Sequence, residues 1–202
     1  MIRIAVCVKQ VPLLSMLTFD SESRRIVREG VNNEVNPFDV NAMSAAVGIS
    51  QLMSSETVAY TMGPPQAREA LVQCLAMGAD RAVHLVDLAF AGSDTLATAR
   101  ALSMALSRDK FDLVICGYNT VDSETGQVGP ELAEMMDLPQ VTAVSSLEVS
   151  DTGRVLMAQR VTDEGREEVN SALPALVTVI EGVTPDIYPR REQMDEARER
   201  PI

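Results

Sequence analysis

The sequence predicts an α/β fold built on a doubly wound parallel sheet. Strand-like apolar runs alternate with helix-like patterns four times over the first 138 residues, which is the rhythm of βαβ crossovers. The first run, residues 2–8, is continuously apolar and rich in β-branched residues, as in a strand covered on both faces. Aromatic residues make up only 3% of the chain, so small apolar residues must fill the core, which suits helices packed closely on a sheet.

The elements that follow the first strand are a small hairpin and a helix. Residues 17–29 contain two short apolar segments around the turn residues 20–23, a pattern that predicts a β-hairpin addition. Asn36 and Pro37 then open a helix that continues to Met53, because Asn is a preferred cap and Pro suits the first turn.

Three further strand–helix units are predicted. Short apolar runs place their strands at 57–62, 81–87 and 112–117. The expected helices are one that ends at Gly78, one within 92–107 that starts near Ser93 or Asp94, and one over 130–137 that ends before Pro139.

The chain changes character beyond residue 142. Residues 143–180 predict two or three strands joined by turns at 151–153 and 163–165, and the apolar run 174–180 is expected to return to the main sheet. The mostly charged residues after 180 predict an arm with a short helix over 192–200 and no packed core. We therefore expect a single α/β domain over 1–182 and a C-terminal arm over 183–202.

Composition narrows the classes of partner. The formal net charge of −12 repels phosphate backbones and disfavours nucleic acid as a partner. Apolar runs are too short for a membrane span, and the N-terminus lacks the pattern of a signal peptide. The three cysteines are widely spaced, without a CxxC pair, and predict buried thiols in a reducing, cytoplasmic setting.

Common catalytic signatures are missing from the sequence. It contains no GxGxxG, no GxxxxGK[ST] and no GxSxG pattern, which argues against the usual dinucleotide fingerprint, a P-loop and a nucleophile elbow. The lone histidine, His84, lies in a strand-like run and is interpreted as a packed residue. A hydrolase is therefore a poor interpretation of this sequence.

The loop that follows the run 112–117 is a candidate binding site. Ligands of open parallel sheets bind beyond the carboxyl ends of the strands, where the winding reverses. Gly126 and Gly129 allow close approach of the backbone, and the helix starting near Val128 directs amide groups into the loop, which suits a phosphate. Asp122 or Glu124 would accept hydrogen bonds from ribose hydroxyls. From spacing alone, an ordinary solvated connector explains the loop equally well.

The residues also resemble a known family over almost the whole chain. Seven segments in the same order carry the resemblance: VCVKQVP (6–12), VNPFDVNAM (35–43), TMGPPQAREAL (61–71), LAMGADRAVHLVD (75–87), FAGSDTLATA (90–99), DSETGQVGPELAE (122–134) and AQRVTDEGREEVNSALPALVT (158–178). The chain resembles the β subunit of electron transfer flavoproteins, the FixA-type family, and is shorter at its C-terminus than typical members.

The resemblance implies a Rossmann-like fold of the adenine nucleotide α-hydrolase type. It also implies a heterodimer with a larger α subunit, in which shared FAD carries electrons between dehydrogenases and an acceptor. The β subunit would hold AMP or a second FAD and would not be an enzyme on its own. The arm over 184–202 corresponds to the family's partner-recognition region. The alternative is a nucleotide-binding or sensing module of the same fold without a redox partner.

The family's nucleotide pocket carries over onto residues of four segments. The implied cofactor-binding residues are Cys7, Asn36, Pro37, Phe38, Asp39, Met62, Gly117, Asn119, Thr120, Val121, Asp122, Ser123, Glu124, Thr125, Gly126, Gln127 and Val128. Thr95 and Thr98 would join them if a second flavin is bound. From spacing alone, capping and helix-surface roles account equally well for these two threonines.

Overall fold

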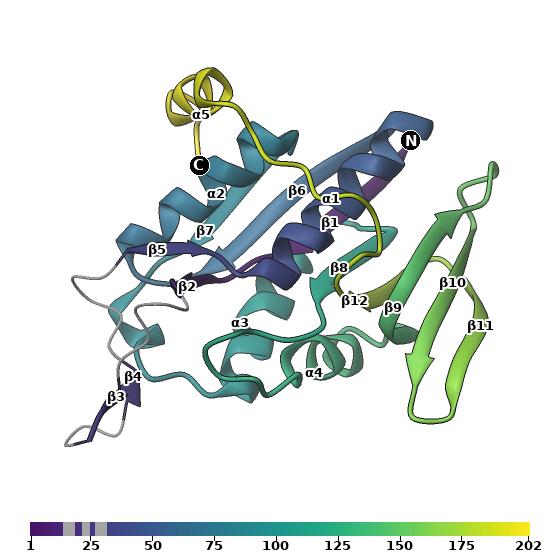
Figure 1. Cartoon of the computed structure of the whole chain (residues 1–202), viewed down its shortest axis with the longest axis horizontal. Coiled ribbons are helices and arrows are strands. Elements are labelled where there is room, and N and C mark those ends of the chain that lie inside the picture. The colour runs from purple at the N-terminus through teal and green to yellow at the C-terminus, as the bar shows by residue number, and fades with distance from the viewer. Residues whose placement is uncertain (14–18, 22–24, 27–31) are drawn as a thin grey trace.

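A computed structural model describes residues 1–13, 19–21, 25–26 and 32–202 of the chain (Figure 1). Within this part, one eight-stranded sheet has the strand order β11-β10-β9-β12-β8-β1-β6-β7. The strands are β1 (Ile2–Cys7), β6 (Ser55–Met62), β7 (Arg81–Leu85), β8 (Leu113–Gly117), β9 (Gln140–Val149), β10 (Val155–Thr162), β11 (Gly165–Ala172) and β12 (Ala175–Val179). The predicted α/β class with a mostly parallel central sheet is confirmed.

The winding of the sheet reverses between β1 and β8. The chain passes from β1 outward to β6 and β7, and then returns to place β8 on the other side of β1. The helices that make these crossings are α1 (Pro37–Leu52), α2 (Arg68–Met77) and α3 (Thr95–Leu106), and α4 (Val128–Met135) follows β8. The carboxyl ends of β1 and β8 therefore form the switch point at which ligands of such sheets bind.

Helices cover both faces of the parallel strands. Along β1, Ile4 and Val6 belong to the core cluster shared with α1 and α2, whereas Ala5 and Cys7 belong to the cluster shared with α3 and α4. Each face of β1 is therefore buried. This explains why the strand reads as a continuous apolar run without the alternation of a half-exposed strand.

The helix boundaries confirm most of the expected signals. Gly78, with φ +127°, follows α2 as predicted. Asp94 caps α3, because its carboxylate accepts a hydrogen bond of 2.8 Å from the amide of Ala97. The 3-10 turns η2 (Pro65–Ala67) and η3 (Leu88–Phe90) lie before α2 and after β7. Asn36 occupies the cap position of α1 but makes no side-chain capping hydrogen bond, so that part of the prediction was wrong.

Two small antiparallel pairs lie outside the main sheet. One joins β2 (Gln10–Pro12) to β5 (Asn33–Val35), and the other joins β3 (Phe19–Asp20) to β4 (Arg25–Ile26). The second pair agrees with the hairpin predicted over 17–29. The rest of that prediction, including residues 22–24 of the turn region, lies outside the described residues.

The C-terminal part contains four strands, not the two or three predicted over 143–180. Strands β9, β10 and β11 form an antiparallel extension. Strand β12 returns to the main sheet as expected, and the structure places it in parallel between β8 and β9. The count was wrong because β11 is exposed along much of its length and carries charges such as Arg166, Glu167 and Glu168. Such a strand lacks the apolar run from which we predicted strands elsewhere.

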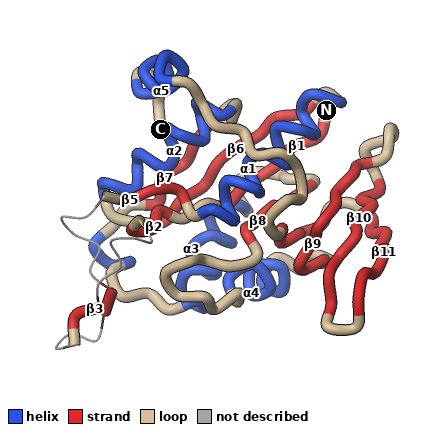
Figure 2. Tube along the Cα trace, viewed as in Figure 1, coloured by secondary structure: helices blue, strands red, loops and turns tan. Residues whose placement is uncertain are grey.

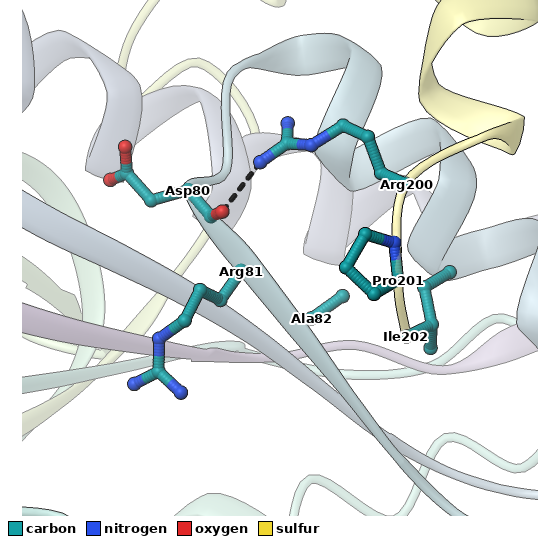
Figure 3. Close-up of a pocket in the computed structure, with 6 residues that line it drawn as sticks. All are labelled: Asp80, Arg81, Ala82, Arg200, Pro201 and Ile202. Atoms are coloured by element: carbon teal, nitrogen blue, oxygen red, sulfur yellow. Dashed lines mark hydrogen bonds between the residues drawn. The ribbon is translucent and has the colours of Figure 1, made fainter.

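The C-terminal arm packs on the domain, contrary to the expectation that it has no packed core. Helix α5 (Arg191–Arg198) lies against α2, and Ala197 is buried in the core cluster. The guanidinium of Arg200 donates to the carbonyls of Ala79 (3.1 Å) and Asp80 (2.5 Å). Figure 3 shows the second of these bonds beside a hollow of about 230 Å³ that is lined by residues 80–82 and 200–202.

A charge cluster ties together the starts of the strands. Glu56 accepts from Arg3 (2.8 Å) and from Arg81 (2.7 Å), and Asp109 pairs with both guanidinium groups. These residues come from β1, β6, β7 and the segment before β8. They lie at the edge of the sheet opposite the switch point, so this network braces the sheet away from the carboxyl ends of β1 and β8.

The contact of α4 with the sheet requires a glycine at position 129. A Cβ atom there would lie 2.5 Å from the Cγ2 atom of Thr178 on β12. We expect Gly129→Ala to lower the free energy of unfolding by about 1–3 kcal/mol through overpacking, as measured by urea denaturation.

Gly48 is the matched control because it also lies in a helix. A Cβ atom at Gly48 would lie 3.9 Å from the nearest atom outside its helix, the hydroxyl oxygen of Thr184. Gly48→Ala should therefore stabilise the chain by about 0.5–1 kcal/mol. Equal effects of the two substitutions would contradict the close packing of α4 on β12.

Candidate functional site

A single carboxylate connects the two strands of the switch point. Asp39, in the first turn of α1, accepts hydrogen bonds from the backbone amide of Lys9 (2.7 Å) and from that of Gly117 (3.2 Å). Lys9 lies just beyond β1, and Gly117 is the last residue of β8. The start of α1 is thereby fixed between the carboxyl ends of the two central strands.

Gly117 is required by this close approach. A Cβ atom at position 117 would collide with the carboxylate of Asp39 and would lie 2.8 Å from the Cβ atom of Phe38. The structure thus brings together two segments that the sequence analysis selected separately, residues 36–39 and the loop after β8.

The environment of Asp39 is unusual for a carboxylate. Burial raises its pKa to about 7, although hydrogen bonds from the Lys9 backbone, the Asn36 side chain and the Gly117 backbone favour the charged form. Asp39 therefore changes its charge near neutral pH, and its hydrogen bonds offset only part of the desolvation of the carboxylate.

Asn36 shapes the loop between β8 and α4 instead of capping its own helix. Its fully buried amide donates to the carbonyl of Asn119 (2.8 Å) and accepts from the amide of Val121 (3.2 Å). The preference of Asn for helix caps did not reveal this role, because both partners lie more than 80 residues away in the sequence.

The loop over 118–127 is also held by contacts within itself. The amide of Glu124 donates to the carbonyl of Thr120 (2.9 Å), and the hydroxyls of Thr120 and Ser123 lie 2.8 Å apart. Glu124 and Gly126 adopt positive φ angles of 51° and 62°. Figure 2 shows this segment as the loop that leads from β8 to α4. The loop is therefore a defined structure with a turn that favours glycine at 126.

Lys9 is a site residue that the sequence analysis missed. Its ammonium group lies 2.6 Å from a carboxylate oxygen of Asp122, whose side chain is fully buried, and 3.4 Å from the hydroxyl of Ser123. The signal was available in the sequence, because a lysine two residues beyond β1 lies at the same edge of the sheet as a loop that follows β8.

The ends of α3 and α4 meet beside the loop. The hydroxyl of Thr95 lies 3.0 Å from a carboxylate oxygen of Glu131 and 3.0 Å from the side-chain oxygen of Gln127. Gln127 occupies the cap position of α4, but its side chain makes no capping hydrogen bond. Thr95 is therefore brought to the end of the loop, whereas the hydroxyl of Thr98 donates to the carbonyl of Asp94 within its own helix.

Cys7 and Met62 lie at the same edge, at the ends of β1 and β6. Among the residues that the structure describes, no helix has the length and apolarity needed to cross a membrane. The site is thus formed by the ends of parallel strands, the first turn of α1 and the loop before α4. The start of α4 supplies a partial positive charge to this loop.

The raised pKa of Asp39 predicts a pH-dependent cost of replacing it. An unfolded aspartate has a pKa of about 3.9, so the folded chain binds more protons than the unfolded chain between that value and about 7. The stability that Asp39 contributes is then fully present below about pH 4 and falls as the pH rises through about 7. We expect Asp39→Asn to lower the free energy of unfolding more at about pH 5 than at about pH 8 in urea titrations. A difference that is the same at both pH values would contradict the raised pKa.

Comparison with known proteins identifies the family of the chain. A family model described as the electron transfer flavoprotein domain matches residues 24–202. The electron transfer flavoprotein subunit beta of Thermoanaerobacterium thermosaccharolyticum is 41% identical over 187 residues, which cover 93% of this chain and 71% of the relative. The subunit of the same name from Clostridium acetobutylicum is 42% identical, with 88% and 68% covered.

A further relative carries a different name. Protein FixA of Sinorhizobium fredii is 40% identical over 186 residues, which cover 89% of this chain and 65% of the relative. The family model and these relatives each cover most of the chain, and the match to the family model includes the loop between β8 and α4. The chain therefore belongs to the electron transfer flavoprotein family, among its β-subunit and FixA-type members.

Proposed function

We propose that the chain is the β subunit of an electron transfer flavoprotein. It pairs with a larger α subunit and contributes to a carrier that moves electrons between dehydrogenases and an acceptor through FAD. FAD, shared with the α subunit, supplies the one- and two-electron chemistry when bound. The residues of this chain bind and orient a nucleotide and do not catalyse a reaction alone. Family membership supports this role, and we propose a cytoplasmic location for it.

The site after β8 is proposed to bind AMP or the ADP part of a second FAD. The observation that carries this proposal is the loop 117–128 itself, which Asn36 and Asp39 hold against the switch point. The backbone of Gly126, Gln127 and Val128 would meet phosphate at the start of α4, where the helix favours negative charge.

A buried polar atom beside the loop suits this ligand. The Oε2 atom of Glu131 is buried and has no hydrogen-bond partner among the described residues. A buried carboxylate oxygen without a donor is destabilising, and a ligand hydroxyl or amino group would satisfy it. Asp122, by contrast, is engaged by Lys9, so its proposed contact with a ribose would have to share that carboxylate.

We propose different roles for the single domain over 1–182 and the arm over 183–202. The domain would bind the nucleotide, and the arm would contact a dehydrogenase or another redox partner. Helix α5 packs on α2 through Met194 and Ala197, while charged residues such as Arg191 and Glu192 are exposed. This exposed charged face is the part of the arm available to a partner.

Co-expression of the chain with an electron transfer flavoprotein α subunit tests the proposed function. We expect a yellow heterodimer with a flavin absorption spectrum, and chromatography of the nucleotides released by denaturation should give AMP beside one FAD, or two FAD per heterodimer. AMP beside one FAD would assign AMP to this chain. Two FAD per heterodimer would assign a second flavin to it. A colourless chain that never binds an α partner would overturn the proposal and favour a nucleotide-binding module without redox partners.

The hydrogen bonds between Asn36 and the loop predict that replacing Asn36 weakens nucleotide binding. Asn36→Ala removes one donor and one acceptor and leaves the carbonyl of Asn119 and the amide of Val121 without their partner. We expect nucleotide affinity to fall by about tenfold or more, measured by calorimetry on the heterodimer.

Asn41→Ala is the matched control on the same helix. Asn41 is also buried, but its amide donates to the carbonyl of Pro37 and accepts from the amide of Gly182, neither of which belongs to the loop over 118–127. This variant should lose stability and keep its nucleotide affinity. Equal affinities of the two variants would argue against the loop as the nucleotide site.

A further inference from the structure

Two buried thiols lie side by side at the switch point. Cys7 ends β1 and is paired in register with Cys116 of β8, the strand next to it in the sheet. Both belong to the core cluster that faces α3 and α4, so their side chains project from the same face. Cys74 is the third cysteine and belongs to the cluster on the opposite face. The chain thus carries one pair of neighbouring thiols and one thiol apart from them.

The spacing of the pair suits one bridging atom. Neighbouring strands of a sheet are about 4.8 Å apart, and in-register side chains on one face start from that separation. A metal–thiolate bond is about 2.3 Å long, so two such bonds in line span about 4.6 Å. A direct bond between the sulfurs would require the two Cβ atoms to approach to about 3.8 Å, closer than the strand spacing.

The surroundings favour a soft ion. Met62 lies at the end of β6, two residues beyond Tyr60, the register partner of Cys7, and on the same face of the sheet. Met62 packs against the same cluster, and soft sulfur ligands such as the two thiolates select ions such as Cu(I).

The start of α4 lies over the pair. A Cβ atom at Gly129 would lie 3.8 Å from the Cβ atom of Cys116. The amino end of a helix carries a partial positive charge, which would stabilise the net negative charge of two thiolates around a monovalent cation.

We propose that Cys7 and Cys116 form a two-thiolate binding site for a soft monovalent cation of the Cu(I) class. On binding, each thiol loses its proton to the solvent, two sulfur–copper bonds form, and all the acetonitrile ligands that delivered the ion depart. The oxidation states of copper and sulfur do not change, so the step requires no oxidant. The bound ion would cross-link β1 to β8 directly below the loop.

Anaerobic titration of the reduced chain with Cu(I), delivered as its acetonitrile complex, tests the site. We expect native mass spectrometry to show one copper per chain, with a thiolate-to-copper absorption band in the ultraviolet. X-ray absorption should show two sulfur neighbours, and copper should raise the melting temperature because it binds the folded chain. Failure of the wild-type chain to bind copper under these conditions would overturn the proposal, whatever the behaviour of any variant.

The three cysteines provide matched variants. Cys7→Ser and Cys116→Ser should each reduce copper affinity by at least about 100-fold. Cys74→Ser, at an equally buried cysteine, should retain it. Circular dichroism would show which variants fold, and Cys7→Ala and Cys116→Ala would replace any that do not. Copper binding that survives the loss of Cys7 and of Cys116, or that disappears with Cys74, would refute the assignment.

Discussion

The arrangement of the sheet edge at the switch point depends on the Asp39 carboxylate. It accepts the amides of Lys9 and Gly117, and it thereby fixes the first turn of α1 to the ends of the two strands where the winding reverses. Asn36, three residues earlier, is then in position to hold the loop after β8. Burial works against this carboxylate, and the same amides that it positions offset part of that desolvation. The loop, the helix start and the strand ends are therefore coupled through one side chain.

Local patterns in the sequence predicted most of the fold. The apolar runs located β1, β6, β7, β8 and β12, and the cap at Asp94 and the glycine after α2 marked helix ends. Each of these signals is contained within a few neighbouring residues. The exposed strand β11 escaped this reasoning because its composition reflects solvent on its surface more than its place in the sheet.

Local sequence patterns did not predict the contacts that form the candidate site. The sequence brought out the loop, residues 36–39 and Thr95, and the structure places these segments at one edge. It did not reveal that Asn36 bonds the loop or that Lys9 reaches Asp122, because these partners are separated by 83 and 113 residues. Which side chains meet across a parallel sheet is decided by strand order. In this chain, strand order follows from the return of β8 to the far side of β1.

The position of β12 has a consequence for synthesis of the chain. It is the last strand in the sequence, yet it lies inside the sheet between β8 and β9. While residues 175–179 are still in the ribosome, the half made of β7, β6, β1 and β8 can assemble, but the outer edge of β8 has no partner. An unpaired edge strand is a template for incorrect pairing, and parallel pairing between distant segments is slow. The nascent chain therefore passes through a stage in which the future centre of its sheet is an open edge.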